Sequence, residues 1–392
     1  MKNVDFNARD NSLVIRLIGH IDSANAAAVE QEIANARAAG AYDSLTVDCS
    51  ELNYISSAGL RIILRLRKEC PKLKVTEVSS EVYEVFEMTG FTEMIDISKA
   101  YRVISVDGCE VIGQGANGKV YRIDRDTIVK VYLNPDSLPD IQRERELARK
   151  AFVLGVPTAI PYDVVRVGDG YGSVFELLNA KSFAKLLKED PSRFDEVVGM
   201  SVDLLKKIHS TELKPGEIPD MKAVALDWAD FLADYLPKER YEKLRALIAA
   251  VPDDNHMMHG DYHVKNVMLQ EGEALLIDMD TLCTGHPVFE LASMYNAYVG
   301  YGELDKSGVE EFLSLPYGLT KRIWRESLRL YVGGDEEKLG EVEDKARIIG
   351  YTRIMRRTIR RKGLETPEGR ATIEHCGNML AELLPRVDTL TF

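Results

Sequence analysis

The feature that most restricts what this chain can be is the segment HGDYHVKN over residues 259–266. Within it, Asp261 is followed five residues later by Asn266, and Asp278 comes twelve residues after Asn266, behind a short apolar run that predicts a strand. Transfer of a phosphoryl group requires a residue that accepts the proton of the attacking hydroxyl, and oxygen ligands for magnesium. The spacing therefore indicates Asp261 as the base and Asn266 and Asp278 as ligands of Mg²⁺.

The two histidines of this segment, His259 and His263, raise a zinc site as an alternative because they stand four residues apart. In the HExxH pattern of zinc proteases a glutamate follows the first histidine. Gly260 occupies that position here. Zinc is therefore the less favoured interpretation of the segment.

A glycine loop precedes this segment in the chain. The sequence GQGANGKV over residues 113–120 places Gly113, Gly115 and Gly118 between two strand-like runs. In dinucleotide-binding folds such glycines open a helix, whereas here a turn and another strand follow. That hairpin is typical of the kinase loop whose backbone amides approach phosphates. An ordinary glycine-rich hairpin is the alternative.

Lys130 lies inside the apolar strand predicted over Thr127 to Tyr132, one hairpin after the glycine loop. A buried lysine needs an anionic partner, and a kinase provides the ATP phosphates and a glutamate on the next helix. In the helix predicted over Ile141 to Leu154, Glu144 shares the apolar face, whereas Glu146 shares a face with basic residues. We therefore predict Glu144 as the partner, with Glu146 as the alternative. A lysine that protects an edge strand is the other interpretation of Lys130.

Together these motifs resemble the aminoglycoside phosphotransferase and choline kinase group, over roughly residues 105–390. The resemblance implies an α+β bilobal protein-kinase-like domain that binds ATP, Mg²⁺ and a hydroxyl-bearing substrate. It also implies that Val174 to Leu178 is the hinge strand, with backbone groups near Glu176 and Leu178 holding adenine. His263 then lies near the transferred phosphate.

The chain departs from this group at two positions. Met279 and Asp280 follow Asp278 in place of a DFG sequence, so Asp280 is either a further metal ligand or a solvated residue. Glu290 stands where the group usually has an aspartate, which leaves its role open. A eukaryotic protein kinase is the less favoured comparison, because the sequence has no APE motif and no long activation segment after Asp278.

The first hundred residues alternate strands and helices, which predicts an α/β sheet with helices on it. The segment over residues 47–60 and the sequence LIGHID over residues 17–22 resemble STAS domains, the anti-sigma factor antagonist family. The resemblance implies that Ser57 is the candidate phosphoacceptor of a partner kinase, before a helix whose dipole favours a phosphate. Ser56 replaces the aspartate that usually precedes this serine, and simple helix capping is the alternative role.

The two resemblances divide the chain. We expect a STAS-like regulatory domain over residues 1–102, a β-rich kinase-like N-lobe over 103–180 and a mostly helical, catalytic C-lobe over 181–392. The net charge of −13 argues against binding to nucleic acid or an anionic membrane, and no apolar run approaches the roughly 20 residues of a membrane helix. Five scattered cysteines and a polar N-terminus without a signal peptide predict a cytoplasmic protein with reduced thiols.

Three functions fit the sequence. The first is an ATP- and Mg²⁺-dependent phosphotransferase that modifies a hydroxyl of an unidentified small molecule, regulated by the STAS-like domain. The second is a partner-switching signalling protein of the anti-sigma factor antagonist type, whose kinase-like domain phosphorylates a protein serine such as Ser57. The third is a catalytically inactive nucleotide sensor, which the complete set of Lys130, Asp261, Asn266 and Asp278 disfavours.

A basic segment near the C-terminus has two interpretations. Five arginines between Arg353 and Arg361 follow helical spacing and predict one basic face. This face either binds an acidic or phosphorylated substrate or, as the favoured interpretation, is solvated or paired with acidic stretches such as residues 335–337.

Overall fold

The computed structural model describes residues 3–9, 11–38, 42–114, 118–134 and 136–392. Contacts divide the chain into two compact units, one formed by Met1–Ser105 with Val164–Asp169 and the other by Val106–Asp163 with Gly170–Phe392. None of the helices in the described ranges combines the length and the apolar character that crossing a bilayer requires.

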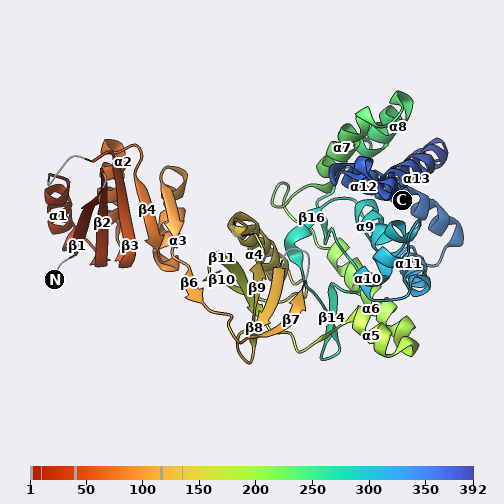
Figure 1. Cartoon of the computed structure of the whole chain (residues 1–392), viewed down its shortest axis with the longest axis horizontal. Helices are drawn as coiled ribbons and strands as arrows, with labels where there is room; N and C mark the ends of the chain where they lie inside the picture. Colours follow the sequence, from red (N-terminus) through yellow and green to blue (C-terminus); the bar gives the residue numbers. More distant parts are fainter. Residues whose placement is uncertain (1–2, 10, 39–41, 115–117, 135) are drawn as a thin grey trace. The chain divides into compact units, whose positions relative to one another are not determined.

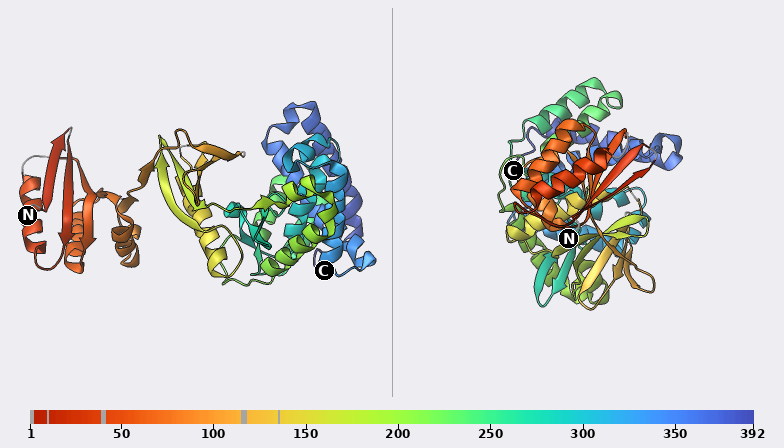
Figure 2. Two further views of the ribbon diagram at one scale, coloured as in Figure 1. Left: turned by 90° about the horizontal axis from the view of Figure 1, so that it is seen from below. Right: turned by 90° about the vertical axis from the view of Figure 1, so that its left-hand side faces the viewer.

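The first unit is built on a five-stranded sheet with the order β1-β2-β3-β4-β5, in which β1 is antiparallel to β2 and the other neighbours are parallel. Its helices pack on this sheet and bury one apolar core (Figures 1 and 2). The elements are β1 Val4–Arg9, β2 Ser12–Ile21, α1 Ala26–Ala38, β3 Ser44–Ile55, α2 Ser57–Glu69, β4 Lys74–Val78, α3 Ser80–Met88 and β5 Asp96–Lys99. This is the α/β sheet that the alternating pattern predicts.

The start of α2 corrects one expectation about the two serines. We expected both to precede the helix, but Ser57 is its first helical residue and Ser56 is the N-cap. The Ser56 hydroxyl accepts a hydrogen bond from the backbone N–H of Ala58 at 3.2 Å, so Ser56 satisfies one of the free N–H groups of the helix end. Ser57 is exposed, and its hydroxyl stands in the first turn, where the helix dipole favours an anion.

Gly59 in the same turn is required by close packing. A Cβ at this position would lie 2.6 Å from Ile55 Cγ1 and 2.9 Å from Ile21 Cγ2, and both isoleucines belong to the core. We expect Gly59→Ala to lower the free energy of unfolding of this unit by roughly 1–3 kcal/mol, because core overpacking costs about that much. Urea denaturation followed by circular dichroism measures it. The control is Ala58→Gly in the same turn. A second glycine-to-alanine change, Gly90→Ala, would not serve, because the φ of 75° at Gly90 would add backbone strain. A stability of Gly59→Ala equal to that of the unmodified chain would contradict the packing.

The second unit begins with a strand-rich N-lobe. Strands β7 Glu110–Gln114, β8 Gly118–Arg122 and β9 Thr127–Tyr132 form an antiparallel meander, and β11 Gly170–Glu176 pairs antiparallel with β9. β6 Arg102–Ile104 pairs in parallel with the Val165–Val167 part of β10 Pro161–Val167, and both of these segments are grouped with the first unit. One long helix, α4 Leu138–Val153, packs on this sheet. The tight turns between β7, β8 and β9 explain why the antiparallel arrangement is predictable.

The C-lobe is mostly helical and holds a second large core (Figure 1). Two small antiparallel ladders, β13 with β16 and β14 with β15, flank the HGDYHVKN segment and the Asp278 segment. The helices and these strands are α5 Phe183–Glu189, α6 Phe194–His209, α7 Met221–Phe231, α8 Lys238–Ala249, β12 Lys181–Ser182, β13 Met257–Met258, β14 Val267–Gln270, β15 Glu273–Leu276, β16 Cys283–Thr284, α9 Val288–Tyr298, α10 Ser307–Leu313, α11 Tyr317–Tyr331, α12 Glu336–Arg360 and α13 Pro367–Leu383.

Candidate active site

Lys130 joins three elements of the site. Its Nζ lies 2.9 Å from Glu144 Oε1 on α4 and 2.7 Å from Asp278 Oδ1 in the C-lobe. Tyr132 donates its hydroxyl to the same glutamate. Burial acts to lower the pKa of Lys130, but the charges of Glu144 and Asp278 raise it overall, so the side chain stays an ammonium.

The choice between the two glutamates of α4 is settled by burial. Glu144 is buried on the side of α4 that faces the sheet, and only 4% of its side chain is exposed. Glu146 is exposed. The structure thus brings Lys130 together with Glu144, the residue that shares the apolar face of the helix.

The glycine loop places two of its three predicted residues in strands. Gly113 lies in β7, where a Cβ would make ordinary contacts with Val120. Gly118 opens β8 and passes so close to the Val131 backbone oxygen that a Cβ would collide with it. Gly118 is therefore required by strand packing, whatever ligand lies beneath the loop. Gly115, the third predicted residue, is outside the described residues.

Asp261 lies in a loop with both of its predicted neighbours. His263 Nε2 is 3.5 Å from Asp261 Oδ2, and the Asn266 side-chain nitrogen donates to the Asp261 backbone oxygen at 3.0 Å. Burial acts to raise the pKa of Asp261, but the hydrogen bond and charge of His263, with the charges of Arg353 and His259, lower it to about 2. Asp261 is therefore ionised at neutral pH.

Glu290, whose role the sequence left open, binds the backbone of the loop that carries Asp261. Its buried carboxylate accepts backbone N–H groups of His259 at 2.6 Å, Gly260 at 3.0 Å and Tyr262 at 3.3 Å. His209 Nε2 lies 3.9 Å away, close enough for charge attraction but too far for a hydrogen bond. Burial acts to raise the pKa of Glu290, but His209, His259 and the loop N–H groups lower it overall. The glutamate fixes the loop that presents Asp261.

His259 ties the loop to the segment that carries Asp278. Its Nδ1 accepts the backbone N–H of Asp261 at 3.3 Å, and its Nε2 lies 3.0 Å from the backbone oxygen of Ile277. An imidazole that accepts at Nδ1 and donates at Nε2 satisfies both contacts. His259 is fully buried. These contacts assign the histidine a positioning role beside the candidate base.

The oxygen groups near Asp278 fit magnesium. Asn266 offers an amide oxygen, and Asp278 a carboxylate that is 44% exposed. Asp280 is half-buried rather than solvated, and burial with the charges of Asp278 and Glu144 raises its pKa to about 7. A divalent cation would offset this excess of negative charge. Magnesium is usually held by one or two carboxylates plus substrate phosphates, not by a complete protein cage. The described part of the chain contains no cluster of three or more His, Cys, Asp or Glu suited to a metal ion.

The predicted hinge, Val174 to Leu178, spans the end of β11, with residues 174–176 inside the strand. Glu176 is the last residue of β11, and its backbone N–H donates to the Ile160 oxygen at 3.1 Å. The Leu177 N–H donates to the Asp126 oxygen at 2.8 Å. Leu178 comes next, and no protein group within the described ranges pairs with its backbone N–H.

The basic segment matches the favoured interpretation in part, because Arg357, Arg360 and Arg361 are exposed and Arg356 pairs with an acidic residue, although not with one of residues 335–337. Arg353 is half-buried and donates to Ser293 Oγ at 2.8 Å, and Arg356 pairs with Asp227 at 3.0 Å. Asp335, from the acidic stretch expected to pair with these arginines, instead caps the N-terminus of their own helix. The arginines are therefore not a simply solvated face, and the partner found is on α7.

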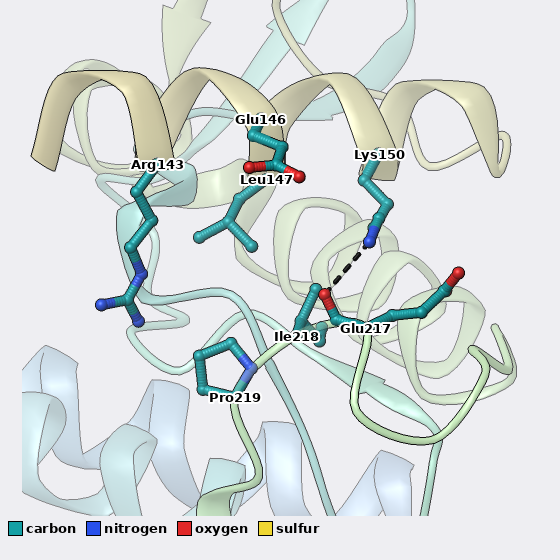
Figure 3. Close-up of a pocket in the computed structure, with 7 residues that line it drawn as sticks. All are labelled: Arg143, Glu146, Leu147, Lys150, Glu217, Ile218 and Pro219. Carbon is teal, nitrogen blue, oxygen red and sulfur yellow. Dashed lines mark hydrogen bonds between the residues drawn. The ribbon is translucent and has the colours of Figure 1, made fainter. Parts of the chain in front are cut away.

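A cavity of about 150 Å³ lies between α4 and residues 217–219 of the C-lobe. Figure 3 shows its lining and the hydrogen bond from Lys150 Nζ to the Glu217 backbone oxygen, which is 3.1 Å long. Leu147 and Ile218 lie between the charged side chains at its rim. The contact ties α4, the helix that carries Glu144, to the C-lobe.

Comparisons with known proteins agree with this architecture. Residues 108–315, more than half of the chain, match the family model of the phosphotransferase enzyme family. Residues 3–103 match the STAS domain model. The family resemblances and the fold class inferred from the sequence are thereby confirmed.

Two bacterial relatives cover the first domain. BtrV of Bordetella bronchiseptica, a candidate anti-sigma factor antagonist, is 36% identical over 95 residues, which is 23% of this chain and 81% of BtrV. The anti-sigma-B factor antagonist of Bacillus subtilis is 26% identical over 100 residues, which is 24% of this chain and 90% of that protein.

Two solved structures share the fold of the second domain. Both are thermostable mutants of the aminoglycoside phosphotransferase APH(4)-Ia in ternary complexes, one with AMP-PNP and hygromycin B and the other with ADP and hygromycin B. Each is 10% identical and covers 72% of this chain and 95% of its own, with TM-scores of 0.51 and 0.50. At this identity the likeness shows the fold alone.

Proposed function

The chain belongs to the phosphotransferase enzyme family and carries a STAS domain at its N-terminus, and we propose that it transfers the γ-phosphate of ATP to a hydroxyl group of a small molecule. The observation that carries this proposal is the position of Lys130, whose ammonium contacts Glu144 of the N-lobe and Asp278 of the C-lobe. This pairing supports the proposal, because a cation between the two lobes can bind phosphates close to their counter-ion.

Each predicted residue then has a defined task. Lys130, held by Glu144, binds phosphate oxygens, and the backbone after β11 near Glu176 and Leu178 holds adenine. Asn266 and Asp278 would hold magnesium, which would offset the negative charge of the phosphates. The β7–β8 hairpin that contains Gly113 and Gly118 covers the phosphates with backbone N–H groups.

Asp261 orients the acceptor. Its carboxylate accepts a hydrogen bond from the acceptor hydroxyl, whose oxygen attacks the γ-phosphorus while the bond to the bridging oxygen of ADP breaks. With a pKa of about 2 the carboxylate is a weak base, so it takes the proton late, when the hydroxyl has become acidic by bonding to phosphorus. His263 beside it keeps the carboxylate in place.

A matched pair of variants on one helix tests this assignment. Purified full-length protein should release ADP from Mg-ATP when offered pools of hydroxylated metabolites. We expect Glu144→Gln to lower kcat/KM for ATP roughly tenfold to a hundredfold, because a misplaced Lys130 costs about that much. Glu146→Gln, an exposed residue on the same helix, is expected to stay within about twofold of the unmodified chain. Equal effects of the two substitutions would overturn the proposed nucleotide site.

A second candidate function rests on the exposed Ser57 at the start of α2. Both named relatives of the first domain are described as anti-sigma factor antagonists. In this alternative the STAS domain binds a protein partner, and Ser57 accepts a phosphate from that partner or from the kinase-like domain. Phosphopeptide mapping of Ser57 after incubation with Mg-ATP, with and without cell extract, tests it. An unmodified Ser57 under both conditions would count against the alternative.

A further inference from the structure

Arg353 is a cation of the C-terminal helices that reaches the loop carrying Asp261. Its Nη1 donates to Ser293 Oγ at 2.8 Å and lies 3.5 Å from the backbone oxygen of Gly260, the residue before Asp261. Its guanidinium also stacks over the ring of Trp228, with 5.5 Å between the guanidinium carbon and the ring centroid. Arg353 therefore places a fixed positive charge beside the candidate base.

Two further arginines continue this feature along the same face of α12. Arg356 lies 5.6 Å from the ring centroid of Phe231, and Arg357 lies 5.1 Å from that of Tyr301. Arg357 also donates to the Tyr301 hydroxyl at 2.8 Å and is exposed. The rings come from α7 and from the turn after α9, and α7 packs against α12 (Figure 1). We call Arg353, Arg356 and Arg357 with these three rings the arginine cluster.

The chemistry of the arginine cluster suits an anion. The exposed Arg357 keeps further N–H donors beyond the one that it gives to Tyr301. A guanidinium with such donors can bind a carboxylate or phosphate with two hydrogen bonds. Among the described contacts of the cluster, the carboxylate partner is Asp227, whose side chain is 69% exposed. With Asp261, whose pKa the charge of Arg353 lowers, two carboxylates stand near three guanidinium groups. The balance is still positive beside the loop, and it would repel a polycationic acceptor.

We propose that the acceptor carries a phosphate or carboxylate group, and that the arginine cluster binds this group while the acceptor's hydroxyl faces Asp261. The inference rests on the proposed function, since it names the substrate class of the same site. It also separates this chain from a phosphotransferase of cationic acceptors, such as those in the two structures that share its fold.

Three small probes with one carbon skeleton test the charge preference. The full chain is titrated by calorimetry with glycerol 3-phosphate, glycerol and 3-amino-1,2-propanediol, each with and without saturating Mg-AMP-PNP. We expect glycerol 3-phosphate to bind at least about tenfold more tightly than the other two, because charge-assisted hydrogen bonds to guanidinium are worth roughly that factor. Equal affinities, or tighter binding of the amine, would overturn the proposal.

Variants assign the preference to the arginine cluster. Arg357→Gln should weaken glycerol 3-phosphate binding roughly tenfold, and Arg357→Lys should restore part of the loss because the charge returns. Arg361→Gln, an exposed arginine at the end of α12, should change nothing. An unchanged affinity in Arg357→Gln, or loss of binding only in Lys130→Met, would place the anion elsewhere and overturn the proposal. AMP-PNP binding is measured in a separate titration. A chain that does not bind AMP-PNP would contradict the proposed nucleotide site but not the charge preference.

Discussion

Asp261→Asn is expected to lower kcat for phosphoryl transfer by roughly a hundredfold to ten-thousandfold, the range that a positioned general base contributes. The amide nearly matches the carboxylate in shape, but it cannot take the proton of the acceptor hydroxyl. The backbone contacts of Asp261 with His259 and Asn266 do not involve the carboxylate, so the loop should keep its conformation. ADP release at saturating Mg-ATP measures the effect.

The control for this variant is binding without turnover. The affinity for Mg-AMP-PNP should stay within about threefold, because Asp261 touches the acceptor and not the adenine or Lys130. Asp253→Asn, at a carboxylate that is 90% exposed on the C-lobe, should leave kcat unchanged. Full activity of Asp261→Asn would remove Asp261 from the mechanism.

Glu290→Ala is expected to produce the largest loss of stability. Removal of the carboxylate leaves the backbone N–H groups of His259, Gly260 and Tyr262 without their acceptor. Loss of one member of a buried charged network costs roughly 3–5 kcal/mol. The corresponding fall in the melting temperature of the second unit is roughly 6–20 °C, and scanning calorimetry of the full chain measures it.

Glu290→Asp and Glu290→Gln separate the causes of this loss. The aspartate keeps the charge but is one methylene shorter, and the glutamine keeps one acceptor oxygen but turns an amide N–H₂ toward other donors. Both should fall between Glu290→Ala and the unmodified chain. Glu326→Ala, in an i,i+3 pair with Arg329 on α11, should cost less than about 1 kcal/mol. A melting temperature of Glu290→Ala equal to that of Glu326→Ala would contradict the role of Glu290.

Much of the fold could be predicted because local patterns and tertiary structure agree. The alternation of apolar runs in the first unit and the tight turns around β8 and β9 each point to one arrangement. Lys130 and Glu144 could be paired because an ionisable side chain on an apolar face needs a partner of opposite charge. The kinase arrangement and the apolar face of the helix pointed to Glu144 as that partner, and the two side chains lie 2.9 Å apart.

Other features could not be predicted because they depend on distant parts of the chain. Strands β1 and β5 lack a continuous apolar run and are ordered by pairing with β2 and β4. Strand β3, Ser44–Ile55, extends well beyond the apolar sequence near its start, and its later residues are buried only at intervals.

The contacts of Glu290 and Arg353 with the loop of Asp261 were not predicted, for the same reason. Glu290 acts across 28 to 31 residues of sequence and Arg353 across 93, so no local spacing connects them to the loop of Asp261. A carboxylate inside the apolar sequence of α9, VFELASMYNAY, was the available signal for Glu290. A buried charge in such a helix indicates a network of hydrogen bonds around it.

The most direct test of the central claim is to follow the γ-phosphate. The full chain and Asp261→Asn are incubated with Mg-ATP labelled in the γ-phosphate and a fractionated metabolite extract, and the label is then separated into small molecules, protein and inorganic phosphate. Our account predicts label in a small anionic metabolite, absent with Asp261→Asn, and an unchanged protein mass. Label confined to protein, with a mass gain of roughly 80 Da at Ser57, would contradict it and make the chain a protein-modifying kinase.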